Sequence, residues 1–318
     1  MTANSHATMS VACGGHALVH ASKVALPLAT LSATASDLGV GVTEMGWAIS
    51  AYTAGMAITS VPAGLASDRF GATPVLSAYF WLSALAATAC ALAHDYSTFL
   101  VAHVVLGLAA GMFHPAGLGL VSTGVPADQV GRAMGTFGLA AAIGTAFMPL
   151  VMGTSAGWRV GFLLLAFVGF LGAGACFWMR VRGLLARGRP VAQAGALQGS
   201  AARHGLVLLM LAMAANAFAA SGFETLFPDH LADRAAAGGG GWLTDGGGEL
   251  ATPGTRMAVL VLALGGLGQW LGGRLAGGPG ATARYALLIL AQPLCMLLLV
   301  RNLDASVAAV VLPMALFT

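Results

Sequence analysis

Histidine and lysine side chains recur along one face of the first apolar stretch, which covers residues 9–34. His16, His20 and Lys23 are spaced i, i+4 and i+7, and this spacing places them in one stripe of a helix. Imidazoles exchange protons near neutral pH, and a lysine inside a membrane helix is costly unless it faces water or a partner. We therefore expect the three side chains to line a central cavity and to handle protons or substrate. Snorkelling of Lys23 to the membrane surface is the alternative.

A second pair of histidines lies in the apolar stretch of residues 97–123. His103 and His114 are three helical turns apart, so they fall on roughly the same face at a separation of about 16 Å. Pro115 follows His114 and is expected to kink or break the helix, which frees the carbonyl of Gly111. The pair is a candidate proton relay or substrate site. The alternative is that each histidine is a hydrogen-bonded packing residue.

Composition shows which elements must position these groups. The chain has 318 residues, of which 58% are hydrophobic and only 8% are charged, whereas soluble domains carry about 25% charged residues. Too little charge is present to coat a water-facing surface. The apolar runs are long and do not alternate, which argues against strands. We therefore expect an all-α membrane protein.

Stretches long enough to cross a hydrocarbon core of about 30 Å mark the candidate spans. They lie at residues 9–34, 44–64, 73–93, 97–123, 130–153, 158–180, 205–228, 256–276 and 283–300, and a further stretch begins near Ser306. The loops on one side hold more arginines than those on the other, among them Arg69, Arg132 and Arg180. The positive-inside rule then predicts a cytoplasmic N-terminus in an inner (plasma) membrane.

The polar segment 181–204 divides the chain after six spans. We expect residues 1–180 to form one six-helix bundle, residues 181–204 a cytoplasmic linker, and residues 205–318 a partial second bundle that is truncated at its end. The basic residues form no stripe of the kind that binds nucleic acid. The four cysteines show no pairing or CxxC signature, and no nucleotide-binding or protease motif is present. No enzyme activity, cofactor or metal is expected.

A glycine-bracketed acidic-basic pair lies between the second and third apolar stretches, in the run Gly64-Leu-Ala-Ser-Asp68-Arg69-Phe-Gly71. This run resembles the loop after the second helix of the major facilitator superfamily, Gly-x-x-x-Asp-Arg/Lys-x-Gly. The resemblance implies two six-helix bundles, the second incomplete here, with about ten spans present in all. It also implies that the pair forms a tight cytoplasmic gating turn and bonds to neighbouring helix ends.

The fifth stretch carries a second resemblance. Gly135, Gly144, Pro149 and Gly153 fall at the spacing of the antiporter motif of proton-coupled drug efflux members, although methionines replace two of its glycines. An ordinary packing face of small residues is the alternative. The run Phe113-His114-Pro115 resembles the fosmidomycin-resistance branch of the same superfamily.

The resemblance also implies that the first and seventh helices line equivalent parts of the cavity. The seventh stretch carries Asn216 and Glu224, and Glu224 is then a possible counter-charge for Lys23. An interfacial carboxylate that caps the outer vestibule is the alternative for Glu224.

Together these features predict a monomeric secondary transporter that moves a small organic solute by alternating access, most simply by proton-coupled efflux. The alternatives are a substrate–proton symporter for uptake and a non-transporting, truncated membrane component. The expected partners are the substrate, protons and the lipid bilayer, and no nucleic acid.

Overall fold

The structure, a computed structural model, describes residues 3–26, 31–152, 157–185, 204, 207–208, 253–275, 280, 283–284 and 287. Its elements, in chain order, are α1 (Ala3–Val24), α2 (Leu31–Asp37), α3 (Val42–Phe70), α4 (Ala72–Leu92), α5 (Tyr96–Gly124), the 3-10 helix η1 (Ala127–Gln129), α6 (Val130–Met152), α7 (Gly157–Val181) and α10 (Pro253–Leu275). All of these elements are helical, so the predicted all-α class is confirmed.

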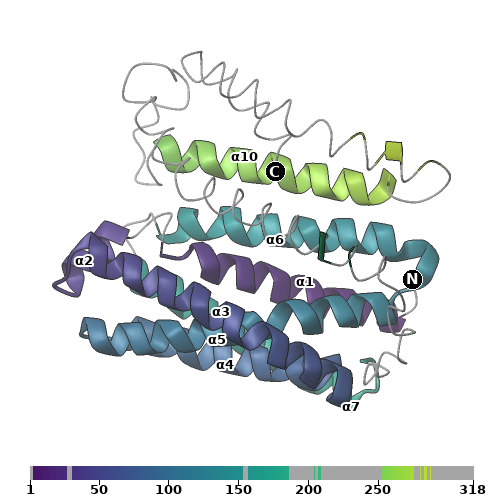
Figure 1. The fold of residues 1–318 in the computed structure, drawn as a ribbon, viewed down its shortest axis with the longest axis horizontal. Helices are drawn as coiled ribbons and strands as arrows, with labels where there is room; N and C mark the ends of the chain where they lie inside the picture. Colours follow the sequence, from purple (N-terminus) through teal and green to yellow (C-terminus); the bar gives the residue numbers. More distant parts are fainter. Residues whose placement is uncertain are drawn as a thin grey trace.

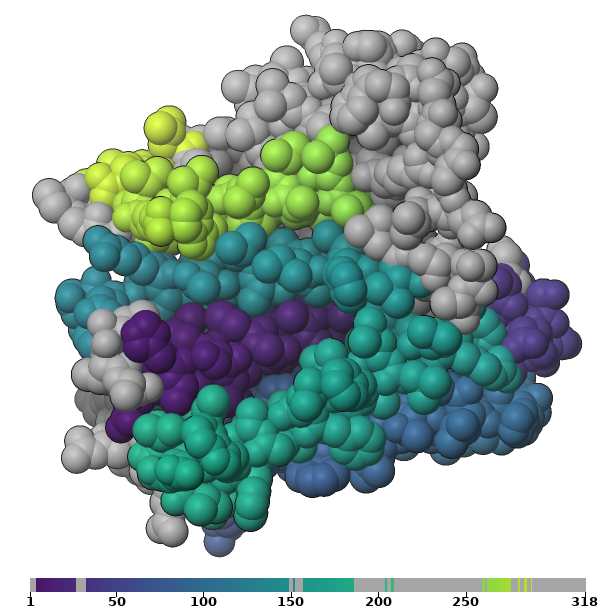
Figure 2. All heavy atoms as spheres, turned by 180° about the vertical axis from the view of Figure 1, so that it is seen from behind, coloured from purple at the N-terminus to yellow at the C-terminus, as the bar shows by residue number. Residues whose placement is uncertain are grey.

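The long helices lie side by side in one bundle, with α1 near its centre (Figure 1). Helix α1 packs against α5, α6 and α7, while α5 also packs against α3 and α4. Helix α10 packs against the other side of α6. Seen from behind, α10, α6, α1 and α7 follow one another across the molecule (Figure 2). Helix α6 is therefore the layer between α1 and α10.

Most predicted spans agree with the helices. The stretches at 73–93, 97–123, 130–153 and 158–180 differ from α4, α5, α6 and α7 by one residue at either end. The stretch at 256–276 corresponds to α10. The stretches at 205–228 and 283–300, and the one that begins near Ser306, fall almost entirely outside the described residues, as does the predicted linker.

The first predicted span is wrong in its extent. Helix α1 begins at Ala3 and ends at Val24, and a separate short helix, α2, follows at Leu31–Asp37. Pro27 explains why α1 cannot continue, because a proline disfavours helical conformation in the residue before it. Lys23 consequently lies in the last turn of α1 and not in the middle of a long helix.

The loop predicted over residues 64–71 is also wrong. Helix α3 continues to Phe70, and the turn into α4 is made by Gly71 alone. Gly71 has φ 89° and ψ 157°, a conformation that only glycine adopts readily. A one-residue turn is possible because this glycine reverses the chain, so Asp68 and Arg69 belong to the last turn of α3.

Helix α5 runs without interruption from Tyr96 to Gly124, with Pro115 inside it. The predicted break at Pro115 is therefore not present. Because α5 is packed on several sides, neighbouring helices hold the residues around the proline in helical conformation.

Small residues bring α3 and α5 into close backbone contact. A Cβ atom at Gly107 would collide with the backbone of Tyr52, and one at Gly111 would collide with the backbone of Met56. From the other side, a Cβ at Gly55 would lie 3.1 Å from the Val104 carbonyl oxygen. Such contacts are how membrane helices associate when burial of apolar surface gives little driving force.

Helices α4, α5 and α7 are long and apolar enough to cross a membrane, and they are the three that meet this criterion among the described residues. Large apolar side chains also project outward from α3, where Trp47, Ile58 and Val61 are 67%, 69% and 71% exposed. An apolar exterior of this kind suits contact with lipid tails.

Candidate functional site

Two histidines of α1 form the centre of the candidate site. His16 is buried and His20 is half-buried. Their ring centroids lie 4.8 Å apart, with the rings nearly perpendicular. The i, i+4 spacing therefore brings the two imidazoles together, as the sequence predicts.

Helix α5 adds a third histidine. The ring of His114 lies 5.4 Å from the ring of His16 and 5.9 Å from the ring of His20, measured between centroids. One ring nitrogen from each of the three residues lies within 4.8 Å of the others. We call these three residues the histidine cluster. His114 is half-buried, so the cluster is not sealed from its surroundings.

Helix α6 orients the ring of His16. The Nδ1 atom of His16 lies 2.7 Å from the carbonyl oxygen of Phe137 in a buried hydrogen bond. A carbonyl oxygen can only accept, so Nδ1 carries the hydrogen and the other ring nitrogen, Nε2, is left for another partner. The ring also stacks on Phe137, with centroids 3.7 Å apart, and on Phe113, at 5.5 Å. Its orientation is therefore held from two sides.

Helix α6 orients His20 in the same way. The hydroxyl of Thr145 donates its hydrogen to the Ala141 carbonyl oxygen at 3.0 Å. The hydroxyl also lies 3.4 Å from Nδ1 of His20, in a contact whose donor depends on the imidazole tautomer. Nε2 of His20 is again the remaining nitrogen.

Lys23 adds a positive charge to this region. It is half-buried in the last turn of α1 and interacts electrostatically with His20 and His114. The predicted stripe of His16, His20 and Lys23 is thus brought together around His114. A cation in the last turn also interacts favourably with the helix dipole, which is a structural role that Lys23 can have as well.

His103 is not part of the cluster. It is buried, and its ring stacks on Phe99 at 5.3 Å and lies 5.1 Å from Tyr52. No hydrogen bond reaches its Nδ1 atom from the described part of the chain. The two histidines of α5, which the sequence places about 16 Å apart, therefore meet different neighbours, and a joint role for them stays a prediction.

The predicted gating residues surround the turn at Gly71. Asp68 and Arg69 are exposed, and the guanidinium of Arg69 lies 5.3 Å from the ring centroid of Phe70. Within the described residues, neither side chain is hydrogen-bonded or ion-paired to another helix end. A Cβ at Gly64 would lie 3.7 Å from Cβ of Pro115, so this glycine packs α3 against α5. The proposed bonds to helix ends remain a prediction.

The glycines of α6 are contact points on two opposite faces. A Cβ at Gly135 would lie 2.9 Å from Cα of Gly273 in α10, and one at Gly144 would collide with the backbone of Ala17 in α1. This is the close packing that the sequence pattern predicts, whichever interpretation of the motif holds. Pro149 lies in the last turn of α6. Gly153, Asn216 and Glu224 lie outside the described residues.

Sequence reasoning missed Phe137 and Thr145, which orient two of the histidines. Their backbone positions, with Ala141 between them, fall at i, i+4 and i+8 on one face of α6. The threonine in this stripe of an otherwise apolar helix was the one feature of the sequence that could have indicated a polar contact here. No periodicity within α6, however, shows which other helix the stripe faces.

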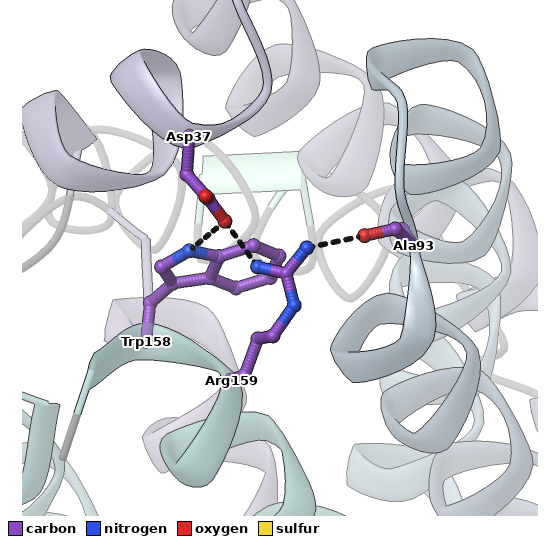
Figure 3. Close-up of polar contacts among 4 residues, drawn as sticks. All are labelled: Asp37, Ala93, Trp158 and Arg159. Carbon is purple, nitrogen blue, oxygen red and sulfur yellow. Dashed lines mark hydrogen bonds and ion pairs between the residues drawn. The ribbon is translucent and has the colours of Figure 1, made fainter.

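A polar cluster that the sequence did not predict lies at the opposite end of α3 from Gly71 (Figure 3). The carboxylate oxygen Oδ2 of Asp37 accepts hydrogen bonds from the guanidinium of Arg159 and, at 3.1 Å, from the indole of Trp158. Arg159 also donates to the Ala93 carbonyl oxygen at 2.7 Å, at the end of α4. We call these four residues the Asp37 clamp. It ties α2, α4 and α7 together.

Comparison with known proteins gives the fold independent support. The profile described as Major Facilitator Superfamily matches residues 12–318. A solved structure of the proton:xylose symporter XylE, bound to 6-bromo-6-deoxy-D-glucose, is similar with a TM-score of 0.68 and 14% sequence identity. The match covers 98% of this chain and 78% of the XylE chain. Identity this low shows a shared fold and no more.

Curated relatives match over shorter segments. The riboflavin transporter RibZ of Clostridioides difficile is 24% identical over 37% of this chain and 26% of its own length. A probable L-galactonate transporter of Escherichia coli is 26% identical over 43% of this chain and 31% of its own length. The multidrug resistance protein MdtL of Klebsiella pneumoniae is 35% identical over 30% of this chain and 24% of its own length. The chain therefore aligns with a third or less of each of these relatives.

Proposed function

Since the chain belongs to the Major Facilitator Superfamily, we propose that it is a secondary active transporter that moves a small organic solute by alternating access. The observation that carries this proposal is the meeting of His16, His20, His114 and Lys23 between α1 and α5 of an apolar bundle. Ionisable groups inside a membrane bundle are costly and are kept where they handle substrate or ions. Members of this superfamily are membrane transporters and not enzymes.

We propose that transport is coupled to protons. The imidazoles of the histidine cluster can exchange protons near neutral pH, and Lys23 lies near enough to interact electrostatically with two of them. Movement of α1 relative to α5 would change these distances and thereby change the tendency of the cluster to hold a proton. Asn216 and Glu224 in the seventh stretch remain proposed parts of the same pathway.

Efflux is the proposed direction. The glycines of α6 follow the spacing of the antiporter motif, and the similarity to MdtL is in keeping with an exporter. Uptake by substrate–proton symport is the second candidate, and the similarity to a probable L-galactonate transporter of E. coli is compatible with either direction. We further propose a monomer in the inner membrane with a cytoplasmic N-terminus, six helices before the linker 181–204, and Asp68 and Arg69 as a latch at the cytoplasmic turn.

The test is transport by the purified protein in proteoliposomes with an imposed pH gradient, screened against small organic solutes. Lys23→Ala should reduce pH-driven transport by about 100-fold, the lower end of what loss of a proton-transfer group costs. Lys23→Arg should keep the charge but impair the cycle, since arginine rarely loses its proton.

The matched control is His94→Gln, because His94 is exposed and lies in the turn between α4 and α5. This variant should transport normally. Normal pH-driven transport by Lys23→Ala would contradict the proposed role of the cluster. Absence of transport for every solute tested, in a folded protein, would favour the non-transporting alternative.

A further inference from the structure

We propose that His16, His20 and His114 bind a first-row transition-metal ion, with Zn²⁺ as the best-fitting candidate. The type of the three ligands, their separation and the orientation of their rings support this assignment. It is independent of which solute the protein moves, and it concerns a ligand that no motif in the sequence predicts.

Distance is the first argument. Bonds from zinc to imidazole nitrogen are about 2.0–2.1 Å, so a tetrahedral site holds its nitrogens roughly 3.4 Å apart. In the histidine cluster the candidate ligand atoms lie within 4.8 Å of one another. Binding a metal would therefore require the three rings to move closer together than they lie here.

Ring orientation is the second argument. His16 donates from Nδ1 to the Phe137 carbonyl oxygen, and Nδ1 of His20 contacts the Thr145 hydroxyl. These contacts use Nδ1 in both rings, so Nε2 is the nitrogen that each ring has left for a metal. Histidine ligands in metal sites generally donate their second nitrogen to a carbonyl or similar acceptor, which fixes the ring and makes it a better ligand. His16 already has such an outer partner, and His20 has a polar contact at the corresponding atom.

The coordination number is the third argument. The three histidines are the one group of candidate ligands found together in the described part of the chain. Three protein ligands leave one tetrahedral position open, as in zinc sites that exchange a water or a bound anion. His20 and His114 are half-buried, so two of the three rings keep some exposed surface.

The positive charge of Lys23 disfavours metal binding, so its removal distinguishes a bound cation from a bound anion. Its charge interacts with His20 and His114 and would repel a divalent cation held between them. An anion would instead be attracted by Lys23, but it would need protonated imidazoles, and three adjacent cations repel one another. The Nε2 lone pair of His16, which its hydrogen bond to Phe137 fixes, therefore favours a metal over an anion. Removing the charge of Lys23 should strengthen the binding of a metal ion and weaken the binding of an anion.

The experiment is titration of the full chain, purified without a polyhistidine tag, with Co²⁺ followed by visible absorption and with Zn²⁺ followed by calorimetry. We expect one ion per chain and the intense visible bands of tetrahedral Co²⁺, displaced by Zn²⁺, which binds more tightly. His20→Ala and His114→Ala should each weaken binding at least tenfold. His114→Cys should restore it, with a new sulfur-to-cobalt absorption band. Thermal unfolding without metal shows whether each variant is folded.

Two further variants decide the outcome. Lys23→Gln should tighten metal binding about tenfold, the size expected for a unit charge several ångströms from a divalent ion at a high effective dielectric constant. His94→Ala should bind metal as the wild type does.

The proposal is wrong if folded His20→Ala and His114→Ala bind metal normally, or if the wild type gives no tetrahedral Co²⁺ signal. Binding of inorganic phosphate that Lys23→Gln weakens, without a metal response, would assign the cluster to an anion. None of these measurements needs transport, so the transport proposal is tested separately.

Discussion

Asp37 uses a single carboxylate oxygen to accept hydrogen bonds from two side chains of α7. The hydrogen bond from Arg159, followed by that from Trp158, lowers the pKa of this carboxyl group below its ordinary value of 3.8. The cation of Arg159 also lies 4.2 Å from the ring centroid of Trp158. The ionised carboxylate is therefore the form that the folded protein stabilises.

We predict that Asp37→Asn destabilises the protein at neutral pH and that the difference disappears in acid. A group with a lowered folded pKa stabilises the fold above its unfolded pKa, and this contribution is lost as the pH falls through the folded pKa. The side chains of Arg159 and Asp37 are 35% and 51% exposed, so solvent screening limits the effect to about 1 kcal/mol or less. Thermal unfolding at pH 7 and at acidic pH measures it.

The matched control for this prediction is Asp68→Asn, which alters an exposed carboxylate without a clamp. Its unfolding temperature should change little at either pH. An equal loss of stability in Asp68→Asn and Asp37→Asn would mean that net charge, and not the Asp37 clamp, is responsible.

At the residue scale, the sequence predicted one half of the histidine cluster. The stripe on α1 could be read from spacing because i and i+4 side chains of one helix must meet. The pairing of His103 with His114 could not be judged in this way. Two side chains about 16 Å apart on one face of α5 can contact different helices, because different helices pack against α5 along its length. His103 meets Tyr52 of α3, and His114 meets α1.

At the scale of elements, α6 depends on the absence of side chains where it meets α1. We predict that Gly144→Ala destabilises the protein by about 1–3 kcal/mol, because the new methyl group would collide with the Ala17 carbonyl and overpack the interface. Separation of α1 from α6 would also weaken the hydrogen bond from His16 to Phe137. Thermal unfolding in detergent measures the first effect.

Gly14→Ala is the matched control, because a Cβ at Gly14 has no atom within 4 Å apart from its local neighbours. It should be neutral or slightly stabilising, since alanine favours helices over glycine. Equal destabilisation by the two substitutions would show that helix propensity and not the contact with α1 determines the result.

The one-residue turn between α3 and α4 gives a second prediction at this scale. Gly71→Ala should destabilise the protein by roughly 1–3 kcal/mol, because alanine is strained at φ 89°. Gly46→Ala, in α3 with open space around the glycine, is the control and should be neutral. If Gly71→Ala unfolds at the same temperature as the wild type, α3 and α4 are not joined by this conformation.

The helices themselves were predictable because long apolar runs are unambiguous, and four of them match within one residue at each end. The end of α3 was not, since the glycines and charges of residues 64–71 suit a loop as well as a helix terminus. The backbone angle of Gly71 decides this point, and it depends on how closely α3 and α4 approach.

At the scale of the whole molecule, the histidine cluster joins α1 and α5, while its outer partners come from α6. A ligand that binds only the folded arrangement must stabilise all of it. We therefore predict that Zn²⁺ at 100 times its Kd raises the free energy of unfolding by about 2.7 kcal/mol. The shift in unfolding temperature should vanish in His114→Ala and persist in His94→Ala. A shift that persists in His114→Ala would place the bound metal elsewhere.

Helix α6 connects its contact with α10 to the hydrogen bond that holds His16. Gly138 of α6 lies against the side chain of Gln269 in α10, and the next residue along the chain, Phe137, holds the imidazole of His16. A sliding movement of α10 along α6 would therefore act one peptide away from that hydrogen bond. The ¹⁵N chemical shift of the His16 ring is sensitive to such a bond, so the protein contains an intrinsic spectroscopic reporter of how α10 is aligned with α6.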